Sequence, residues 1–246
     1  MIKFFRKIRQ NIIMENKTGK YFKYAIGEIV LVVIGILIAL QINNWNQNQG
    51  IKKQLKNYRT SLLSEIDKDF KEIERIDSLN LSHTSQINEY FSLYNSYTME
   101  LDTLLSKKKS TNPTSQNFQS NLYSIDELIT SGNISFFKQK EKLAIITLKK
   151  QIELYTYYEK EFVAATENRW DKYDDTDDMA FQDGLTKTQN KHIKKLSSDI
   201  NSDYFRHFNN ALTSYLKYYE YQDHIYSKRI KPELINLKNI LLENVN

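Results

Sequence analysis

The feature that most constrains this chain is an almost unbroken apolar run at residues 25–42, AIGEIVLVVIGILIALQI. A helix rises about 1.5 Å per residue, so a run of this length just spans a hydrocarbon core about 30 Å thick. Lipid cannot hydrogen-bond to free backbone amides, and a single spanning segment must therefore be helical. Tyr21 and Tyr24 before the run and Trp45 after it are typical interfacial anchors. The run predicts a transmembrane helix over residues 24–45.

Basic residues are concentrated before this run. Residues 1–28 hold seven basic and two acidic residues, which accounts for the whole formal net charge of +5, and the other 28 basic and 28 acidic residues cancel. The positive-inside rule therefore predicts a cytoplasmic leader at residues 1–23 and an extracytoplasmic domain at residues 46–246. That domain therefore has no excess of positive charge that would indicate nucleic-acid binding. The residues expected at the inner membrane surface are Lys3, Arg6, Lys7, Arg9, Lys17, Lys20 and Lys23.

A cleaved signal peptide is the main alternative to this membrane anchor. The leader is longer than a normal n-region, and the run ends in Ala39-Leu40-Gln41 rather than in a small-x-small cleavage site. We therefore expect an uncleaved signal-anchor in a bacterial inner membrane, with the bulk of the chain in the periplasm. The complete absence of cysteine is consistent with that oxidising compartment.

The leader itself has an amphipathic pattern. Its apolar residues recur at helical spacing, and basic residues occupy the rest of the surface. This pattern favours an interfacial helix that lies on anionic lipid, although a basic tail that only sets topology is the alternative. Membrane lipid is thus one expected partner. The apolar positions are Met1, Phe4, Phe5, Ile8 and Ile12.

Within the apolar run, Glu28, Gly35 and Ala39 share one helical face. Gly35 and Ala39 form a small-xxx-small pair, which lets two membrane helices approach closely. An acid within a membrane segment often marks a functional contact, yet Glu28 lies near the inner interface where headgroups can reach it. We interpret the face as a candidate helix–helix seam. The alternative is an interfacial acid next to the normal small-residue content of membrane helices.

The remaining 200 or so residues contain very few helix breakers, since the whole chain has six glycines and two prolines. This scarcity, with no β-branched alternation, predicts a few long helices rather than a sheet. We expect an all-α fold, in which one transmembrane helix is followed by an antiparallel bundle of long helices with coiled-coil-like packing. The expected helices cover residues 51–105, 118–131, 133–173 and 190–245.

The first of these helices is ambiguous in one place. Apolar residues keep their phase through the polar patch at residues 80–85, where Asn80 and Thr84 fill core positions. A turn would normally reset that phase, so we favour one helix bent near Ser82 over a hairpin at residues 78–85. Residues 107–117, KKKSTNPTSQN, have the composition of a loop. Pro232 should kink the last helix or open a new one.

Tyrosine is abundant, with 17 residues in the chain and clusters at residues 155–158 and 215–226. Tyrosines on helical stripes usually pack in a core with the hydroxyl at its rim. The alternative is an exposed face that binds peptide or glycan. We expect the core arrangement.

Two groups of residues could hold a metal, and neither matches a known template. Asp203 and His207 are one turn apart, a spacing that suits zinc, but no third ligand follows in register. The acidic stretch suits calcium by composition but lacks the order of an EF-hand loop, so a solvated turn is favoured. Its residues are Asp171, Asp174, Asp175, Asp177, Asp178, Asp183 and Gly184.

Catalytic signatures are also missing from the sequence. It contains no G-x-S-x-G element, no phosphate-binding loop, no dinucleotide fingerprint and no cysteine nucleophile. We therefore expect no enzymatic activity, no catalytic residue, no cofactor and no metal.

The first 47 residues resemble a family of uncharacterised single-pass membrane proteins from Bacteroidota (a domain of unknown function of the DUF 6090 type). The stretches that carry the resemblance are Met1–Gln10, Glu15–Lys17, Lys20–Tyr21 and Tyr24–Asn46. A weaker likeness follows at residues 128–134, LITSGNI. The resemblance implies an inner-membrane protein with a helical periplasmic domain. It implies no activity, substrate or catalytic residue.

These patterns together favour a non-enzymatic envelope scaffold, whose helical domain contacts a second copy or another envelope protein. The alternative is a periplasmic module that senses a ligand and signals through its membrane helix to a partner.

The expected orientation can be tested with reporter fusions after Asn246. A reporter that works only outside the cytoplasm should be active there, because the basic residues precede the apolar run. Activity of a cytoplasm-specific reporter at the same position would contradict this topology.

Overall fold

The computed structural model describes residues 18–96 and 98–244, and these residues contain helices and no strand. The chain is thus all-α over its described part. The expected leader helix and its basic residues Lys3, Arg6, Lys7, Arg9 and Lys17 lie outside that part, as do the side chains of Lys20 and Tyr21.

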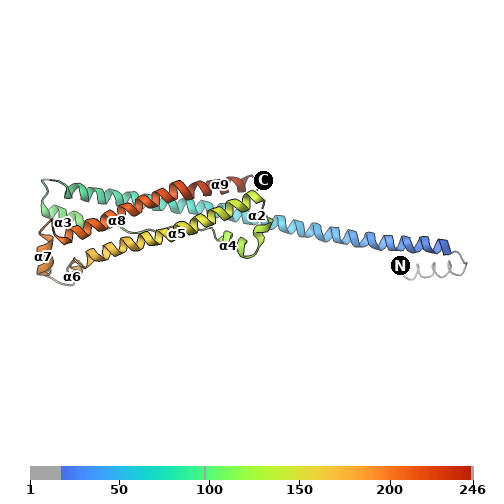
Figure 1. Cartoon of the computed structure of the whole chain (residues 1–246), viewed down its shortest axis with the longest axis horizontal. Helices are drawn as coiled ribbons and strands as arrows, with labels where there is room; N and C mark the ends of the chain where they lie inside the picture. Colours follow the sequence, from blue (N-terminus) through green and yellow to red (C-terminus); the bar gives the residue numbers. More distant parts are fainter. Residues whose placement is uncertain (1–17, 97, 245–246) are drawn as a thin grey trace. The chain divides into compact units, whose positions relative to one another are not determined.

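The apolar run lies in α2 (Thr18–Tyr94), which is drawn from blue to green in Figure 1. A boundary between two compact units, Met1–Asn57 and Tyr58–Asn246, falls within this helix. In the first unit, the most apolar window of 18 residues has a mean hydropathy of 2.6, and 0% of it is buried within the chain. By length and composition, α2 is the one helix of the described residues that could cross a membrane. It is therefore a candidate membrane span.

The second unit contains the end of α2 and all later elements. In it α5 packs against α8 and α9, and α7 packs against α8 (Figure 1). The elements are α3 (Leu101–Ser110), α4 (Tyr123–Thr130), the 3₁₀ turn η1 (Asn133–Phe136), α5 (Gln139–Asp174), α6 (Met179–Gln182), α7 (Lys191–Ser197), α8 (Asp203–Ile225), the π-helical turn η2 (Tyr226–Ile230) and α9 (Lys231–Leu242).

Helix α2 continues through the polar patch, so the expected single helix is correct there and the hairpin at residues 78–85 is wrong. Asn80 is buried, and its side-chain amide donates to Gln222 of α8 at 2.8 Å. This bond pairs the side-chain amide nitrogen of a polar residue at a core position, whereas the Asn80 Oδ1 is buried without a hydrogen-bond partner. The predicted end at residue 105 is wrong, however, because α2 ends at Tyr94. Beyond it Ser96 and Thr98 bond to each other and to the local backbone, which competes with the helix.

Other observed helices are also shorter than expected, or are divided into separate helices. The expected single segment at 190–245 is interrupted between α7 and α8, where Ser202 donates to the Leu196 carbonyl and Asp199 accepts from the Asn201 amide. The long helix expected from residue 133 starts at Gln139, where Glu141 caps the Lys138 amide. Pro232 is the second residue of α9, which follows α8 through the π-helical turn η2 with helical backbone at both junctions, so the chain does not leave the helix at Pro232 and no separate new helix opens with it.

The core of the second unit is apolar and rich in tyrosine. The expected core arrangement is confirmed for Tyr215, Tyr218, Tyr219 and Tyr226, which are buried. It is wrong for Tyr157, which is 60% exposed, and Tyr158 is exposed as well. Fully buried aliphatic side chains come from all the long elements, including Leu62, Ile66, Ile73, Ile76, Ile87, Leu148, Leu212, Leu234 and Leu237.

An extended segment at residues 111–122 lies within this helical unit. The predicted helix at 118–131 is therefore too long, because α4 begins only at Tyr123. Side chains hold the extended backbone: Tyr219 donates to the Thr114 carbonyl and Tyr218 to the Gln116 carbonyl, each at 2.8 Å. Asp69 of α2 accepts from the Asn121 amide at 2.6 Å. The segment thus obtains from side chains the hydrogen bonds that a helix would have supplied.

Glu159 of α5 lies at the centre of the network around this segment. It is only 4% exposed and accepts from Gln222 at 2.6 Å, from the Tyr226 hydroxyl and from the Phe118 amide. Burial raises the pKa of its carboxyl, although these donors act in the opposite direction. Loss of this carboxylate would leave the Tyr226 hydroxyl and the Phe118 amide without their acceptor, whereas Gln222 also donates to the Gln116 carbonyl.

Replacement of Glu159 by leucine should therefore lower the free energy of unfolding by about 3 kcal/mol or more, given about 1–3 kcal/mol for each unpaired buried donor. Urea unfolding followed by circular dichroism measures this change. Glu161→Leu is the matched control, because Glu161 is exposed on the same helix. Equal losses in the two variants would argue against the network.

Candidate functional site

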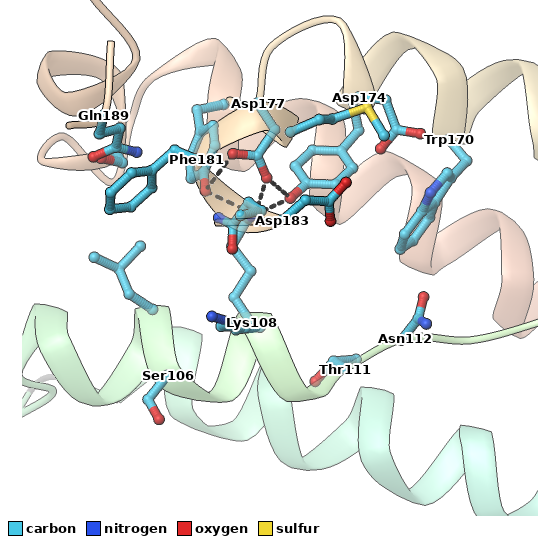
Figure 2. Close-up of a pocket in the computed structure, with 17 residues that line it drawn as sticks. Ser106, Lys108, Thr111, Asn112, Trp170, Asp174, Asp177, Phe181, Asp183 and Gln189 are labelled. Carbon is cyan, nitrogen blue, oxygen red and sulfur yellow. Dashed lines mark hydrogen bonds and ion pairs between the residues drawn. The ribbon is translucent and has the colours of Figure 1, made fainter. Parts of the chain in front are cut away.

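A cavity of about 710 Å³ lies in the second unit, bordered by α3, the end of α5, α6 and the start of α8. Figure 2 shows Lys108 extending from α3 towards Asp177, with Trp170 and Phe181 on opposite sides of that pair in this view. The lining residues combine aromatic rings with charged groups of both signs. A molecule that enters this cavity would meet both aromatic rings and charged groups.

Lys108 is the most unusual residue of the cavity. It is 4% exposed, since it falls on the same face of α3 as Leu104 and Leu101, four and seven residues earlier. Its ammonium donates to the Tyr204 hydroxyl at 2.9 Å, to the Tyr173 hydroxyl, and to Asp177 at 3.4 Å. An ammonium has three donors, and all three are used here.

Aromatic rings surround the same ammonium. Its nitrogen lies 4.1 Å from the ring centroids of both Tyr173 and Tyr204, and 4.6 Å from that of Phe208. Such distances give attractive cation–π contacts, which are strongest where water is excluded. Three aromatic rings therefore lie close to the Lys108 ammonium, and two of them also bond to it through their hydroxyls.

Asp177 supplies the opposing charge. Its side chain is 7% exposed and accepts from both tyrosine hydroxyls and from the Asp178 amide at 2.8 Å. Burial alone would raise the pKa of this carboxyl, but the Lys108 charge and the Tyr173 hydroxyl outweigh burial and lower it. Asp177 is therefore ionised at neutral pH.

Burial affects the cationic partner more strongly. It lowers the pKa of Lys108 from 10.5 to about 8, even though the Asp177 charge acts in the opposite direction. Burial also raises the pKa of the Tyr173 and Tyr204 hydroxyls, which stay neutral donors. The site thus holds one ion pair with two neutral phenols between its members.

Three residues of the predicted acidic stretch reach this cavity. Asp174, Asp177 and Asp183 line it. Burial raises the pKa of Asp174, and the neighbouring Asp171 and Asp177 add to that effect. Asp178 does not join them, because it accepts from the Phe181 and Asn190 amides, which fixes the turn around α6.

The residues considered above as candidate metal ligands are not brought together in a group of three or more. Among the described residues, no group of three or more His, Cys, Asp or Glu side chains is placed to hold a metal ion. Asp203 pairs with Arg206 at 2.7 Å. The turn at Gly184, with φ +71°, has the left-handed backbone that glycine favours.

The predicted seam residues Glu28, Gly35 and Ala39 lie on α2 in the first unit, where all three are exposed. A Cβ atom at Gly35 would meet no atom within 4 Å, and the same holds at Gly27. The interfacial anchors Tyr24 and Trp45 and the basic Lys23 are also exposed. Within the described residues, Gly35 and Ala39 of this face are therefore exposed.

Lys108 was not a predicted site residue, because the KKK run has the composition of a loop. The structure corrects this, since Lys107–Ser110 form the last turn of α3. One signal in the sequence could have found it: Leu101, Leu104 and Lys108 have the spacing of one helical face. The tyrosines around the ammonium come from α5 and α8, and that pairing is visible only in three dimensions.

Comparison of the chain with protein-family models, curated proteins and solved structures gave no match. The resemblance of the first 47 residues to a Bacteroidota membrane family therefore stays an expectation.

Raising the pH from about 7 to about 9.5 should stabilise the wild type relative to Lys108→Met. The folded-state pKa of Lys108 is about 8, below its unfolded value of 10.5, so the unfolded chain holds more protons between these values and stability rises with pH. Ionisation of tyrosines in the unfolded chain opposes this above about pH 10. Urea unfolding at a series of pH values measures the difference between the two proteins.

Lys107→Met is the control for this experiment, since Lys107 forms its ion pair with Glu89 and is not in the Lys108 cluster. The difference in the free energy of unfolding between the wild type and Lys107→Met should change little over the same pH range. If the corresponding difference between the wild type and Lys108→Met is also constant with pH, the lowered pKa of Lys108 is contradicted.

Proposed function

We propose that this chain is a single-pass inner-membrane protein without enzymatic activity, which presents a helical domain to another envelope protein or to a second copy of itself. The observation that carries the proposal is the apolar part of α2, which has a mean hydropathy of 2.6 and is 0% buried within the chain. A continuous exposed apolar surface needs lipid or a partner to cover it.

The proposed topology has the leader in the cytoplasm and residues 46–246 in the periplasm. The distribution of basic residues supports this orientation, because they precede the apolar run. We also propose that the second unit is an antiparallel, coiled-coil-like bundle, which the packing of α5 against both α8 and α9 supports. Membership of the Bacteroidota single-pass family is part of the same proposal, supported by the motifs of the first 47 residues.

Self-association through the membrane helix is the specific form of contact that we propose. Gly35 and Ala39 lie one turn apart on α2, and neither carries a side chain that would keep a second helix at a distance. Glu28 shares this face two turns earlier and could bond to a group on the second helix. Contacts of this kind are driven by close backbone packing, since lipid provides no hydrophobic force between helices.

The second candidate function is a ligand-sensing module that signals through its membrane helix. The observation that favours it is the cavity of about 710 Å³ beside Lys108, which has aromatic walls and a buried ion pair. Drug-sized ligands fit cavities of about 300–1,000 Å³. This function requires a small molecule that enters the cavity.

Gly35→Leu should reduce homodimer crosslinking in native membranes by about tenfold, because the larger side chain separates the helices. Gly27→Leu is the matched control, since residue 27 lies about 80° around the helix from residue 35. Neither substitution meets another atom of the chain at the Cβ position, so a difference reports contact with a second molecule. Equal crosslinking in the two variants, or a monomer in the wild type, would contradict the seam.

A further inference from the structure

Four residues around Lys108 form what we call the ammonium cage: Tyr173, Asp177, Tyr204 and Phe208. Three of them have ring centroids 4.1–4.6 Å from the Lys108 nitrogen, and the fourth is a buried carboxylate. Aromatic faces together with one carboxylate are the chemistry by which proteins bind organic ammonium ions. The cage belongs to α5, α8 and the turn after α5, whereas its occupant comes from α3.

Lys108 is an imperfect occupant of this cage. A primary ammonium is compact and strongly hydrated, so it loses much solvation when it is buried. The lowered pKa of Lys108, about 8, indicates that Asp177 and the ring faces do not fully replace this lost water. An ammonium with alkyl groups on nitrogen is more weakly hydrated and would lose less, while it keeps the charge that the ring faces attract.

The cavity gives such an ion access to the cage. Lys108, Tyr173, Asp177 and Tyr204 all line it, so a molecule in the cavity touches the cage directly. Trp170 adds a further aromatic side chain that packs edge-on against Tyr173, with ring centroids 5.4 Å apart. The other charges on the lining are Lys109, Asp174 and Asp183, so acidic residues outnumber basic ones there. Negative charge beside aromatic walls favours a cation.

We propose that the cage and its cavity bind a small organic ammonium ion, preferably a quaternary one, in competition with the side chain of Lys108. This inference rests on the second candidate function and names its ligand class. Entry of the ligand displaces the Lys108 ammonium from Tyr173, Tyr204 and Asp177. Those are the contacts by which Lys108 links α3 to α5 and α8, so binding would loosen α3.

The test uses the full-length protein in detergent micelles and tetramethylammonium chloride as the probe. The chain has two tryptophans, and Trp45→Phe leaves Trp170, which lines the cavity, as the only one. We expect a saturable change in Trp170 fluorescence with tetramethylammonium and none with sodium chloride at equal ionic strength. Lys108→Ala should lower the half-saturating concentration by about tenfold or more, since the side chain that competes with the ligand for the cage is removed.

Two further variants localise the binding. Asp177→Asn in the Lys108→Ala background should weaken binding by about tenfold, because it removes the charge that faces the ligand. Lys107→Ala should leave binding as in the wild type, since Lys107 is adjacent in α3 but does not line the cavity. Circular dichroism checks that each variant is folded, and Lys108→Gln replaces Lys108→Ala if the latter does not fold.

Three outcomes would overturn the inference. One is the absence of any saturable change in both the wild type and the folded Lys108 variant. Another is binding to the Lys108 variant alone, which would make the cage a structural site for lysine. The last is a change caused only by other small molecules, such as amino acids or dicarboxylates, which would leave a ligand-sensing function standing with a different ligand class.

Discussion

Hydrogen bonds from buried side chains to backbone groups organise the second unit. The extended segment at residues 111–122 brings backbone donors and acceptors into a helical core, and they are bonded by Tyr218, Tyr219, Asp69 and Glu159. An unpaired group of this kind costs about 1–3 kcal/mol, so these polar side chains are as necessary as the apolar ones around them. The same cost explains why Lys108 uses all three of its donors.

The fold was predictable from the sequence wherever apolar periodicity decided it. The spacing of the apolar residues correctly predicted that α2 continues through Asn80. A long-range hydrogen bond to Gln222 replaces an apolar contact at that position. The helix ends were less predictable. At Ser96 and at residues 198–202, short polar side chains bond to the backbone and stop the helix without any glycine or proline. Such helix ends depend on a small difference in free energy between side-chain-to-backbone hydrogen bonds and helical backbone hydrogen bonds. Amino-acid composition does not reveal this difference.

The candidate site was predictable only in part. The acidic stretch was recognised, and three of its residues do line the cavity, but its main partner is a lysine rather than a metal ion. Lys108 lies between two other lysines, and nothing in the composition separates it from them. Its burial results from the register of α3, and its aromatic neighbours come from residues 65 to 100 positions later. The sequence predicts the helical face on which Lys108 lies, but not the residues of other helices that contact it.

The way in which the extended segment is held also affects how this protein can evolve. Tyr218 and Tyr219 bond to carbonyl oxygens, which every residue type possesses, so these two bonds do not depend on the side chains of Thr114 and Gln116. An insertion or deletion would instead shift every later carbonyl away from its donor and move Phe118 out of its buried place. The length of the segment should thus be more constrained than the residue types at the two bonded carbonyls.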